Sequence, residues 1–154
     1  MNKKTRVELL WIVGVLVVIA AAMYWNFMVV ENQSSEIAQA DNGKIPTGPN
    51  VIDVVATQWL WSFTNSTGNT TYDAFTVNVS QTYTLVITSA PTPTSSAVIH
   101  SLLIPQLGLQ SYAVPGQTNI IHFTPTHTGS YYFVCAEYCG EGHYTMRGYM
   151  TVVP

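Results

Sequence analysis

An uninterrupted apolar run near the N-terminus is the feature that most constrains how this chain can fold. Residues 9–30 read LLWIVGVLVVIAAAMYWNFMVV, in which Asn26 is the only strongly polar residue. A helix rises about 1.5 Å per residue, so this run spans roughly 33 Å and can cross a hydrocarbon core of about 30 Å. We therefore expect residues 1–30 to form one N-terminal transmembrane anchor.

The charges that flank this run predict its orientation. Lys3, Lys4 and Arg6 precede it, whereas Glu31 and Glu36 follow it. The positive-inside rule then places the N-terminus in the cytoplasm and makes the chain a single-pass protein of the plasma membrane. A cleaved signal peptide, ending at the three alanines within the run, is the alternative. The apolar run continues well past those alanines, which favours the anchor, and either interpretation places the rest of the chain outside.

Charged residues are scarce in this chain. Only 8% of the 154 residues are charged, against about 25% in an average soluble protein. So few basic residues leave no electrostatic footprint for nucleic acid. A surface built from Ser, Thr and Asn changes its charge little in strong acid, which leads to the hypothesis of an acidic medium and an archaeal host.

Beyond residue 50 the sequence pattern favours β-structure. Residues 31–50 lack periodicity and end in Pro and Gly, so we expect a linker there. The sequence then turns to β-forming residues of period two, with turn signals between them. The strands expected from this pattern are 51–63, 72–79, 83–88, 97–104, 111–114, 118–124, 130–135 and 148–153. Short strands at this spacing predict an all-β sandwich over residues 51–154.

Four Asn-X-Ser/Thr triplets are compatible with an extracytoplasmic domain. They begin at Asn32, Asn65, Asn69 and Asn78, and such triplets are acceptors for N-glycosylation on exposed loops. A chain this rich in Ser and Thr also produces several triplets by chance. The sequence leaves their modification open.

Both cysteines of the chain fall in one short segment, residues 135–146, which read CAEYCGEGHYTM. A disulfide would suit an oxidising compartment, although closing so short a loop constrains the unfolded chain little. The segment also holds His143 and Met146. Thiolate, imidazole and thioether together form a soft donor set that suits copper. Zinc is the metal alternative, but it has no use for the methionine.

Any metal site here needs a second histidine from elsewhere, and the chain offers three. His100 lies within the strongly apolar stretch at 97–104, where a buried imidazole without a partner would be costly, so a ligand role is favoured. His122 alternates with apolar residues in an expected strand, and His127 lies in an expected turn. We expect surface positions for these two.

With this loop and histidine, the chain resembles subunit II of haem-copper oxidases of the cytochrome c oxidase type, which carries a dinuclear copper A centre. The resemblance rests on residues 135–146, on VIHS at 98–101, on AVPG at 113–116 and on ATQWLWSF at 56–63. It extends from residue 51 to the C-terminus. It implies a cupredoxin-like Greek-key β-sandwich, and the single apolar span resembles the short, one-helix form of the subunit.

The resemblance also assigns residue roles. Two copper ions would be bridged by both cysteine thiolates, capped by one histidine each, and contacted weakly by the methionine and by a backbone carbonyl. The implied ligands are His100, Cys135, Glu137, Cys139, His143 and Met146. The Glu137 carboxylate would share a magnesium ion with the catalytic subunit. Trp59 would be the ring through which electrons enter, although the alternation pattern alone favours Trp59 and Trp61 as core aromatics on one strand face.

The implied function is electron transfer within a hetero-oligomeric respiratory oxidase. Subunit I of the haem-copper oxidase would be the partner and would carry out the oxygen chemistry. Because the outer domain has few carboxylates, electrostatic steering of a donor is weak. We expect a cupredoxin or a cytochrome that docks through an apolar or polar patch. The alternatives are a copper A subunit of a nitric oxide reductase and a non-redox, membrane-anchored sandwich with a Cys135–Cys139 disulfide.

Overall fold

The N-terminal unit of the chain is one long helix. The computed structural model describes residues 2–34 and 45–154, and α1 spans Lys3–Ser34. Its stretch Lys3–Val29 has a mean hydropathy of 2.4 and is long and apolar enough to cross a membrane. The polar Asn26 donates from Nδ2 to the carbonyl of Ala22 at 2.9 Å, which satisfies one of its amide hydrogens within the helix, as a lipid environment requires. Residues 35–44 of the expected linker lie outside the described part.

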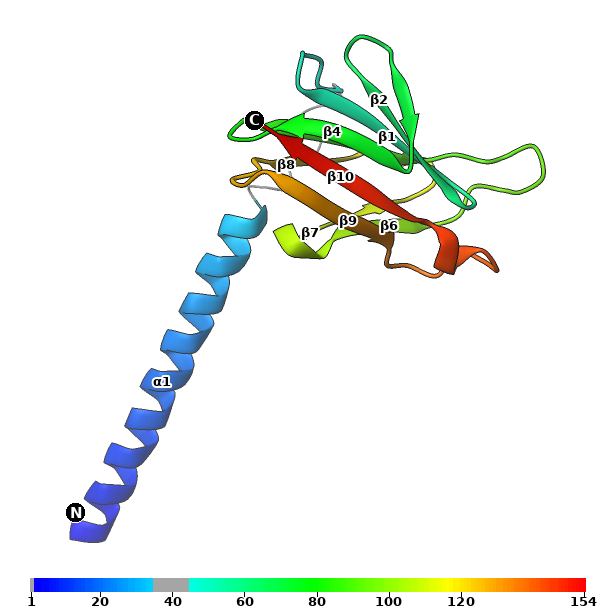
Figure 1. Cartoon of the computed structure of the whole chain (residues 1–154). Coiled ribbons are helices and arrows are strands. Elements are labelled where there is room, and N and C mark those ends of the chain that lie inside the picture. The colour runs from blue at the N-terminus through cyan, green and yellow to red at the C-terminus, as the bar shows by residue number, and fades with distance from the viewer. Residues whose placement is uncertain (1, 35–44) are drawn as a thin grey trace. The chain divides into compact units, whose positions relative to one another are not determined.

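The second unit is a sandwich of two five-stranded sheets. Its strands are β1 (Val51–Thr57), β2 (Leu60–Asn65), β3 (Thr70–Tyr72), β4 (Ala74–Asn78), β5 (Tyr83–Ser89), β6 (His100–Ile104), β7 (Leu109–Ala113), β8 (Asn119–Phe123), β9 (Gly129–Cys135) and β10 (Arg147–Val153). One sheet has the order β3-β2-β1-β5-β8 and the other β4-β10-β9-β6-β7. Most pairs are antiparallel, but β1–β5 and β4–β10 are parallel. Figure 1 shows β10 beside β4 and β9. The expected all-β sandwich is confirmed.

The core lies between the two sheets and follows the period of two that strands impose. In β1 the residues Ile52, Val54 and Ala56 are buried in alternation. Phe63 of the first sheet stacks on Phe75 of the second with ring centroids 4.4 Å apart. Aromatic packing of this kind joins the two sheets and provides a fixed support for the loops at their ends.

The stretch expected to be one strand over 51–63 is a hairpin. A turn at Gln58 and Trp59 separates β1 from β2, and the two strands pair from Thr57 opposite Leu60 onward. The expectation that Trp59 and Trp61 share one buried strand face was therefore wrong. Trp61 is fully buried, whereas Trp59 is 38% exposed in the turn. Alternation cannot locate a turn that contains neither glycine nor proline.

The stretch expected to be one strand over 72–79 is also divided. β3 and β4 are separated by Asp73, whose φ of 50° lies in the left-handed region. The Asp73 carboxylate accepts a hydrogen bond from the Trp61 backbone N–H at 2.9 Å. Its own backbone carbonyl accepts from the N–H of Tyr149 at 3.1 Å. Asp73 thus connects the first sheet to the start of β10. Asp and Asn tolerate this backbone conformation better than most residues.

Burial raises the pKa of the Asp73 carboxyl, and the Trp61 N–H opposes this shift only in part. A carboxyl whose pKa is raised in the folded state stabilises the fold below its unfolded pKa, and that contribution is lost as pH rises through the folded value. Asp73→Asn keeps an acceptor oxygen and removes the titration. We expect the variant to gain thermal stability over the wild type as pH rises from 3 to 7. Melting temperatures of the pair across this range, with the exposed Asp53→Asn as a control, test this, and a constant difference would contradict it.

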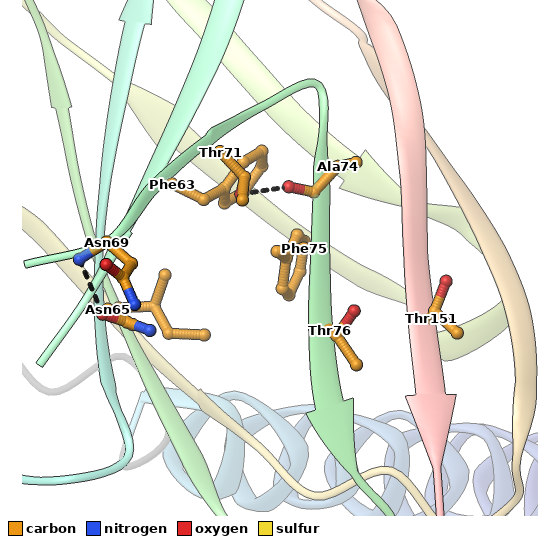
Figure 2. Close-up of a pocket in the computed structure, with 9 residues that line it drawn as sticks. Phe63, Asn65, Asn69, Thr71, Ala74, Phe75, Thr76 and Thr151 are labelled. Atoms are coloured by element: carbon orange, nitrogen blue, oxygen red, sulfur yellow. Dashed lines mark hydrogen bonds between the residues drawn. The ribbon is translucent and has the colours of Figure 1, made fainter. Parts of the chain in front are cut away.

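A pocket of about 360 Å³ opens between the sheets and is shown in Figure 2. Phe63 and Phe75 supply aromatic surface, while Thr76 and Thr151 supply hydroxyl groups from β4 and β10. None of its lining residues is charged. The pocket therefore suits an uncharged group with both apolar and hydroxylated surfaces.

Candidate metal centre

Strand pairing brings the upstream histidine to the cysteine loop. His100 begins β6 and Cys135 ends β9, and these strands pair antiparallel with Leu102 opposite Cys135. The backbone N–H of Ala136 donates to the carbonyl of Ser101 at 2.8 Å. A histidine 35 residues upstream in the sequence is thus a neighbour of the loop in space.

The loop itself is closed at its base and shaped by a short 3-10 turn. The Cys135 N–H donates to the carbonyl of Met146 at 2.9 Å, which joins the two ends. The 3-10 turn His143–Thr145 follows Gly142, and β10 begins directly after Met146. Both ends of the loop therefore continue into paired strands, which holds the intervening side chains in place.

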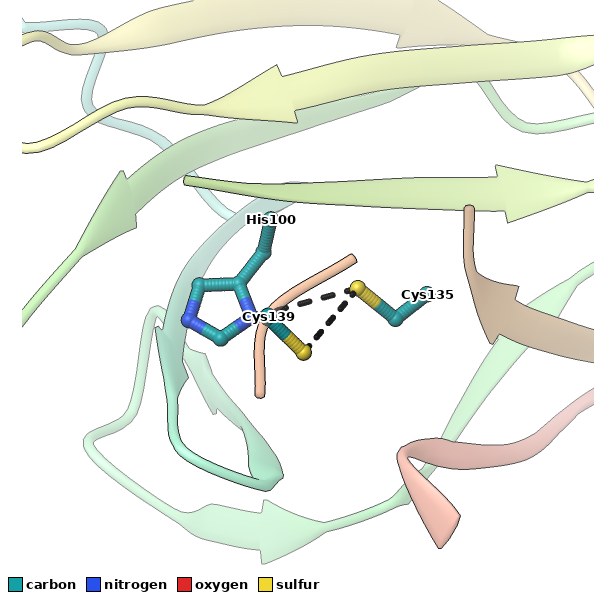
Figure 3. Close-up of side chains that lie close together, drawn as sticks. All are labelled: His100, Cys135 and Cys139. Carbon is teal, nitrogen blue, oxygen red and sulfur yellow. Dashed lines mark hydrogen bonds between the residues drawn. The ribbon is translucent and has the colours of Figure 1, made fainter. Parts of the chain in front are cut away.

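The donor atoms of the loop and of His100 converge. Figure 3 shows the His100 ring and the two cysteine sulfurs facing one another. The Cys135 Sγ lies 3.8 Å from the Cys139 Sγ and 3.9 Å from the His100 Nδ1. The Met146 Sδ lies 3.1 Å from that same nitrogen and 3.7 Å from the Cys139 Sγ. Both cysteines and Met146 are buried, as is His100.

Two further donors lie beside the sulfur pair. The Nδ1 of His143 is 3.4 Å from the Cys139 Sγ, and the backbone carbonyl of Glu137 accepts from the Cys135 thiol at 3.2 Å. Each cysteine therefore has one imidazole nitrogen beside it. The structure brings together all six residues that the sequence resemblance named. It places His122 against Thr84 at 2.9 Å and His127 against Thr126 at 2.9 Å instead.

The spacing of these atoms fits a bound metal better than a disulfide. Both cysteines are free, and their 3.8 Å separation is far beyond the roughly 2.05 Å of a sulfur–sulfur bond. Donors that share a tetrahedral metal, at about 2.3 Å for thiolate and about 2.0 Å for imidazole, lie roughly 3.5–3.8 Å apart. The group of His100, Cys135 and Cys139 keeps all its ligand atoms within 4.8 Å. Soft sulfur donors combined with imidazole select copper or zinc among the common metals.

The electrostatics of the group also favour a cation. Burial, followed by the nearby His143, lowers the pKa of His100 to about 4, which keeps its imidazole neutral and able to ligate. Burial and the adjacent Cys135 raise the pKa of the Cys139 thiol to about 12. Two adjacent thiolates in this buried place are costly unless a cation balances them. A bound metal reverses that cost because it deprotonates its own thiol ligands.

Trp59 contacts the loop from the hairpin turn between β1 and β2. Its indole Nε1 donates to the carbonyl of Cys139 at 3.0 Å. A Cβ added at Gly142 would lie 2.4 Å from the indole Cδ2, so the ring packs directly on the loop backbone. The exposed part of Trp59 and this hydrogen bond connect solvent to a cysteine of the cluster.

Gln58 is the residue of this site that sequence reasoning missed. Its Nε2 donates to the same Cys139 carbonyl at 2.5 Å, so one oxygen accepts from two side chains of the turn. Metal ligands can be recognised in a sequence by their charged or soft donor atoms. An amide side chain that only positions the backbone of a ligand residue has no such distinguishing chemistry. Its place beside Trp59 is the only signal that could have indicated it.

The sandwich, with donors gathered at a loop between its last two strands, belongs to the cupredoxin-like class of folds. Solved structures share this fold. The periplasmic domain of subunit II of cytochrome oxidase (CoxB) of Bradyrhizobium japonicum is 24% identical, with a TM-score of 0.60 over 71% of this chain and 88% of that chain. One chain of a heme-copper terminal oxidase dimer is 19% identical, with a TM-score of 0.62 over 90% of this chain and 95% of that chain.

The family match names the class more narrowly. Residues 84–153 match the family model of the cytochrome c oxidase subunit II periplasmic domain. Over these residues, somewhat less than half of the chain, it is similar to cytochrome c oxidase subunit II. The matched range includes His100 and the whole cysteine loop, whereas Trp59 lies before it. The chain thus combines a cupredoxin-like domain, similar to the periplasmic domain of that subunit, with an apolar N-terminal helix that fits a single-pass membrane protein.

Proposed function

We propose that this chain is the electron-transfer subunit of a respiratory terminal oxidase. It accepts electrons from an external donor at a dinuclear copper centre and passes them to a haem-copper catalytic subunit that reduces oxygen to water. The observation that carries this proposal is the pair of buried, free sulfurs 3.8 Å apart, each with an imidazole Nδ1 beside it. Zinc would need only four ligands and would leave the Met146 sulfur without a role.

The residues of the cluster would bind the metals in three different ways. Cys135 and Cys139 would share both ions through their thiolates, while His100 and His143 would each bind one ion through Nδ1. Met146 and the Glu137 carbonyl would be weak ligands, one on each side. When bound, a copper pair shared by two thiolates supplies one-electron exchange with little change in ligand geometry. The loop, tied to β9 and β10, keeps these donors in place before and after each transfer.

The Glu137 side chain has a separate proposed role at a subunit boundary. Its backbone belongs to the cluster, and the residue is half-buried at the start of the loop. By the family resemblance, its carboxylate would face the catalytic subunit and share a magnesium ion there. A carboxylate oxygen is a ligand that magnesium prefers.

We propose that electrons enter through Trp59, which is exposed on one side and bonded to the Cys139 carbonyl on the other. The loop surface nearby is largely aromatic, with Tyr138 74% exposed and Tyr144 77% exposed, beside a single exposed carboxylate, Glu141. A donor would therefore dock through an apolar patch, as a cupredoxin or a cytochrome of low surface charge can do. Its association rate would depend little on salt.

In the proposed orientation, the basic residues before α1 remain in the cytoplasm and the β domain lies outside the plasma membrane. Affinity purification of the tagged chain from its own membranes in mild detergent tests the partnership. We expect a hetero-oligomeric complex that contains haem, consumes oxygen and loses that activity when the chain is removed. A chain that purifies without any haem subunit would contradict the proposal.

Met146→Leu tests the weak axial role of the thioether. Leucine fills a similar volume without the sulfur, so we expect the variant to retain two coppers per chain but to show a raised reduction potential. Met150→Leu is the matched control, because Met150 is equally buried on β10 but is not part of the cluster. Redox titration of both variants measures the effect, and equal potentials in the two variants would count against a ligand role.

A further inference from the structure

The structure distinguishes among the four Asn-X-Ser/Thr triplets and favours one of them. Asn65 lies at the end of β2, exposed at the tip of the β2–β3 hairpin. Its Oδ1 accepts three hydrogen bonds: from the Thr67 hydroxyl at 2.7 Å, the Thr67 N–H at 3.0 Å and the Asn69 N–H at 3.0 Å. The third residue of the triplet thus contacts the amide of the first. Figure 2 shows Asn65 and Asn69 together at the side of the pocket.

This arrangement prepares the Asn65 amide nitrogen to receive a sugar. Three donors on Oδ1 draw electron density from the amide, which makes its nitrogen-bound protons more acidic. The same bonds fix the side-chain orientation, so an incoming reagent meets a single conformer. Among the described residues, none accepts a hydrogen bond from the Asn65 Nδ2.

Among the side chains that the structure describes, no other triplet shows this combination. The hydroxyl of Thr71, third residue of the Asn69 triplet, donates to the Ala74 carbonyl instead of to Asn69. Asn78 is half-buried in β4, where its N–H donates to the Tyr83 hydroxyl at 3.0 Å. Asn32 lies within α1, where the backbone is helical. Exposure and the hydroxyl–amide contact coincide at Asn65 alone among the described parts of these triplets.

The pocket beside Asn65 offers a place for an attached sugar. It has a volume of about 360 Å³ and is lined by Asn65 itself. The rings of Phe63 and Phe75 provide apolar surface on which the carbon-bound hydrogens of a sugar ring can pack, and the hydroxyls of Thr76 and Thr151 provide hydrogen-bonding groups. An uncharged pocket that combines these surfaces matches the two-sided chemistry of a hexose.

We propose that Asn65 is a site of N-linked glycosylation. The donor class is an oligosaccharide bonded through the anomeric carbon of its first sugar to a lipid phosphate or pyrophosphate. The Asn65 Nδ2 forms a bond to that carbon as the carbon–oxygen bond to phosphate breaks. The nitrogen gives one proton to a base of the transferase, and the lipid phosphate leaves with the bonding electron pair, so no oxidant or reductant is needed. The proposal rests on the extracytoplasmic orientation proposed above.

Mass spectrometry of glycopeptides from the full chain, isolated from its own membranes, tests this proposal. We expect sugar mass on Asn65 in most molecules. Thr67→Ala should remove it completely, whereas Thr71→Ala, which deletes the matching hydroxyl of the Asn69 triplet, should leave it in place. An unmodified Asn65 would overturn the proposal, whether or not another triplet carries sugar.

A second measurement separates this proposal from those on which it depends. Protease added to sealed vesicles with the outer face exposed should remove the β domain. A domain that is cut but carries no sugar on Asn65 contradicts the glycosylation alone. A protected domain overturns the orientation and the glycosylation together. Copper binding by Thr67→Ala should equal that of the wild type, because Thr67 takes no part in the cluster.

Discussion

Replacing Cys139 with serine is expected to abolish the dinuclear copper signal and to lower copper binding from two ions per chain to one at most. The Cys139 sulfur lies within 3.8 Å of three other donor atoms, those of Cys135, His143 and Met146. A serine hydroxyl is a hard donor that stays protonated at neutral pH, so it cannot replace a thiolate shared by two coppers. Metal analysis and electron paramagnetic resonance of the full chain in detergent measure the loss.

The serine variant should still fold, because the hydroxyl is close to the thiol in size. Ser111→Ala is a suitable control, since it alters another buried side chain, on β7, outside the cluster. It should retain both coppers. Unchanged copper content and an unchanged spectrum in Cys139→Ser would contradict the shared-thiolate arrangement.

Replacing Gly148 with alanine is expected to cause a large loss of stability in the β domain. A Cβ at this position would lie 1.8 Å from the backbone carbonyl oxygen of Asp73 and 2.6 Å from the Phe133 ring. Backbone cannot yield as a flexible side chain can. We expect a cost of about 3 kcal/mol from overpacking, which corresponds to a fall of roughly 10–20 °C in melting temperature for a domain of this size.

The same change should also affect the metal loop, because β10 begins directly after it. Thr151→Ala is the control on that strand, where the side chain is exposed, and it should cost less than about 0.5 kcal/mol. Thermal unfolding of the three proteins without metal measures the difference. If Gly148→Ala melts within about 2 °C of the wild type, the close contact between β10 and Asp73 is not present in solution.

The metal cluster could be predicted from the sequence because its chemistry depends on residue types that are rare in this chain. Both cysteines lie in one loop, and His100 lies within an apolar stretch in which a lone imidazole would be costly. Surface positions for His122 and His127 were expected from strand alternation and from a turn signal, and the structure places each beside a threonine hydroxyl away from the cluster. The ligand roles themselves remain predictions.

What the sequence could not show depends on contacts between distant residues. The turn at Gln58 and Trp59 contains no glycine or proline, so alternation extended one strand through it. The break at Asp73 depends on a left-handed residue that is held by hydrogen bonds from Trp61 and Tyr149. The parallel pairing of β1 with β5 follows from sheet topology, which no local pattern encodes. The Gln58 contact with the Cys139 carbonyl was missed for the same reason.

Copper stoichiometry, measured together with the paramagnetic spectrum of the same sample, tests the central claim most directly. The full chain is purified in detergent under reducing conditions, loaded with copper and freed of excess metal. We predict two coppers per chain and a spectrum in which one unpaired electron couples equally to both copper nuclei. A chain that binds no copper with both thiols reduced, or a single copper with the spectrum of an isolated ion, would contradict the claim.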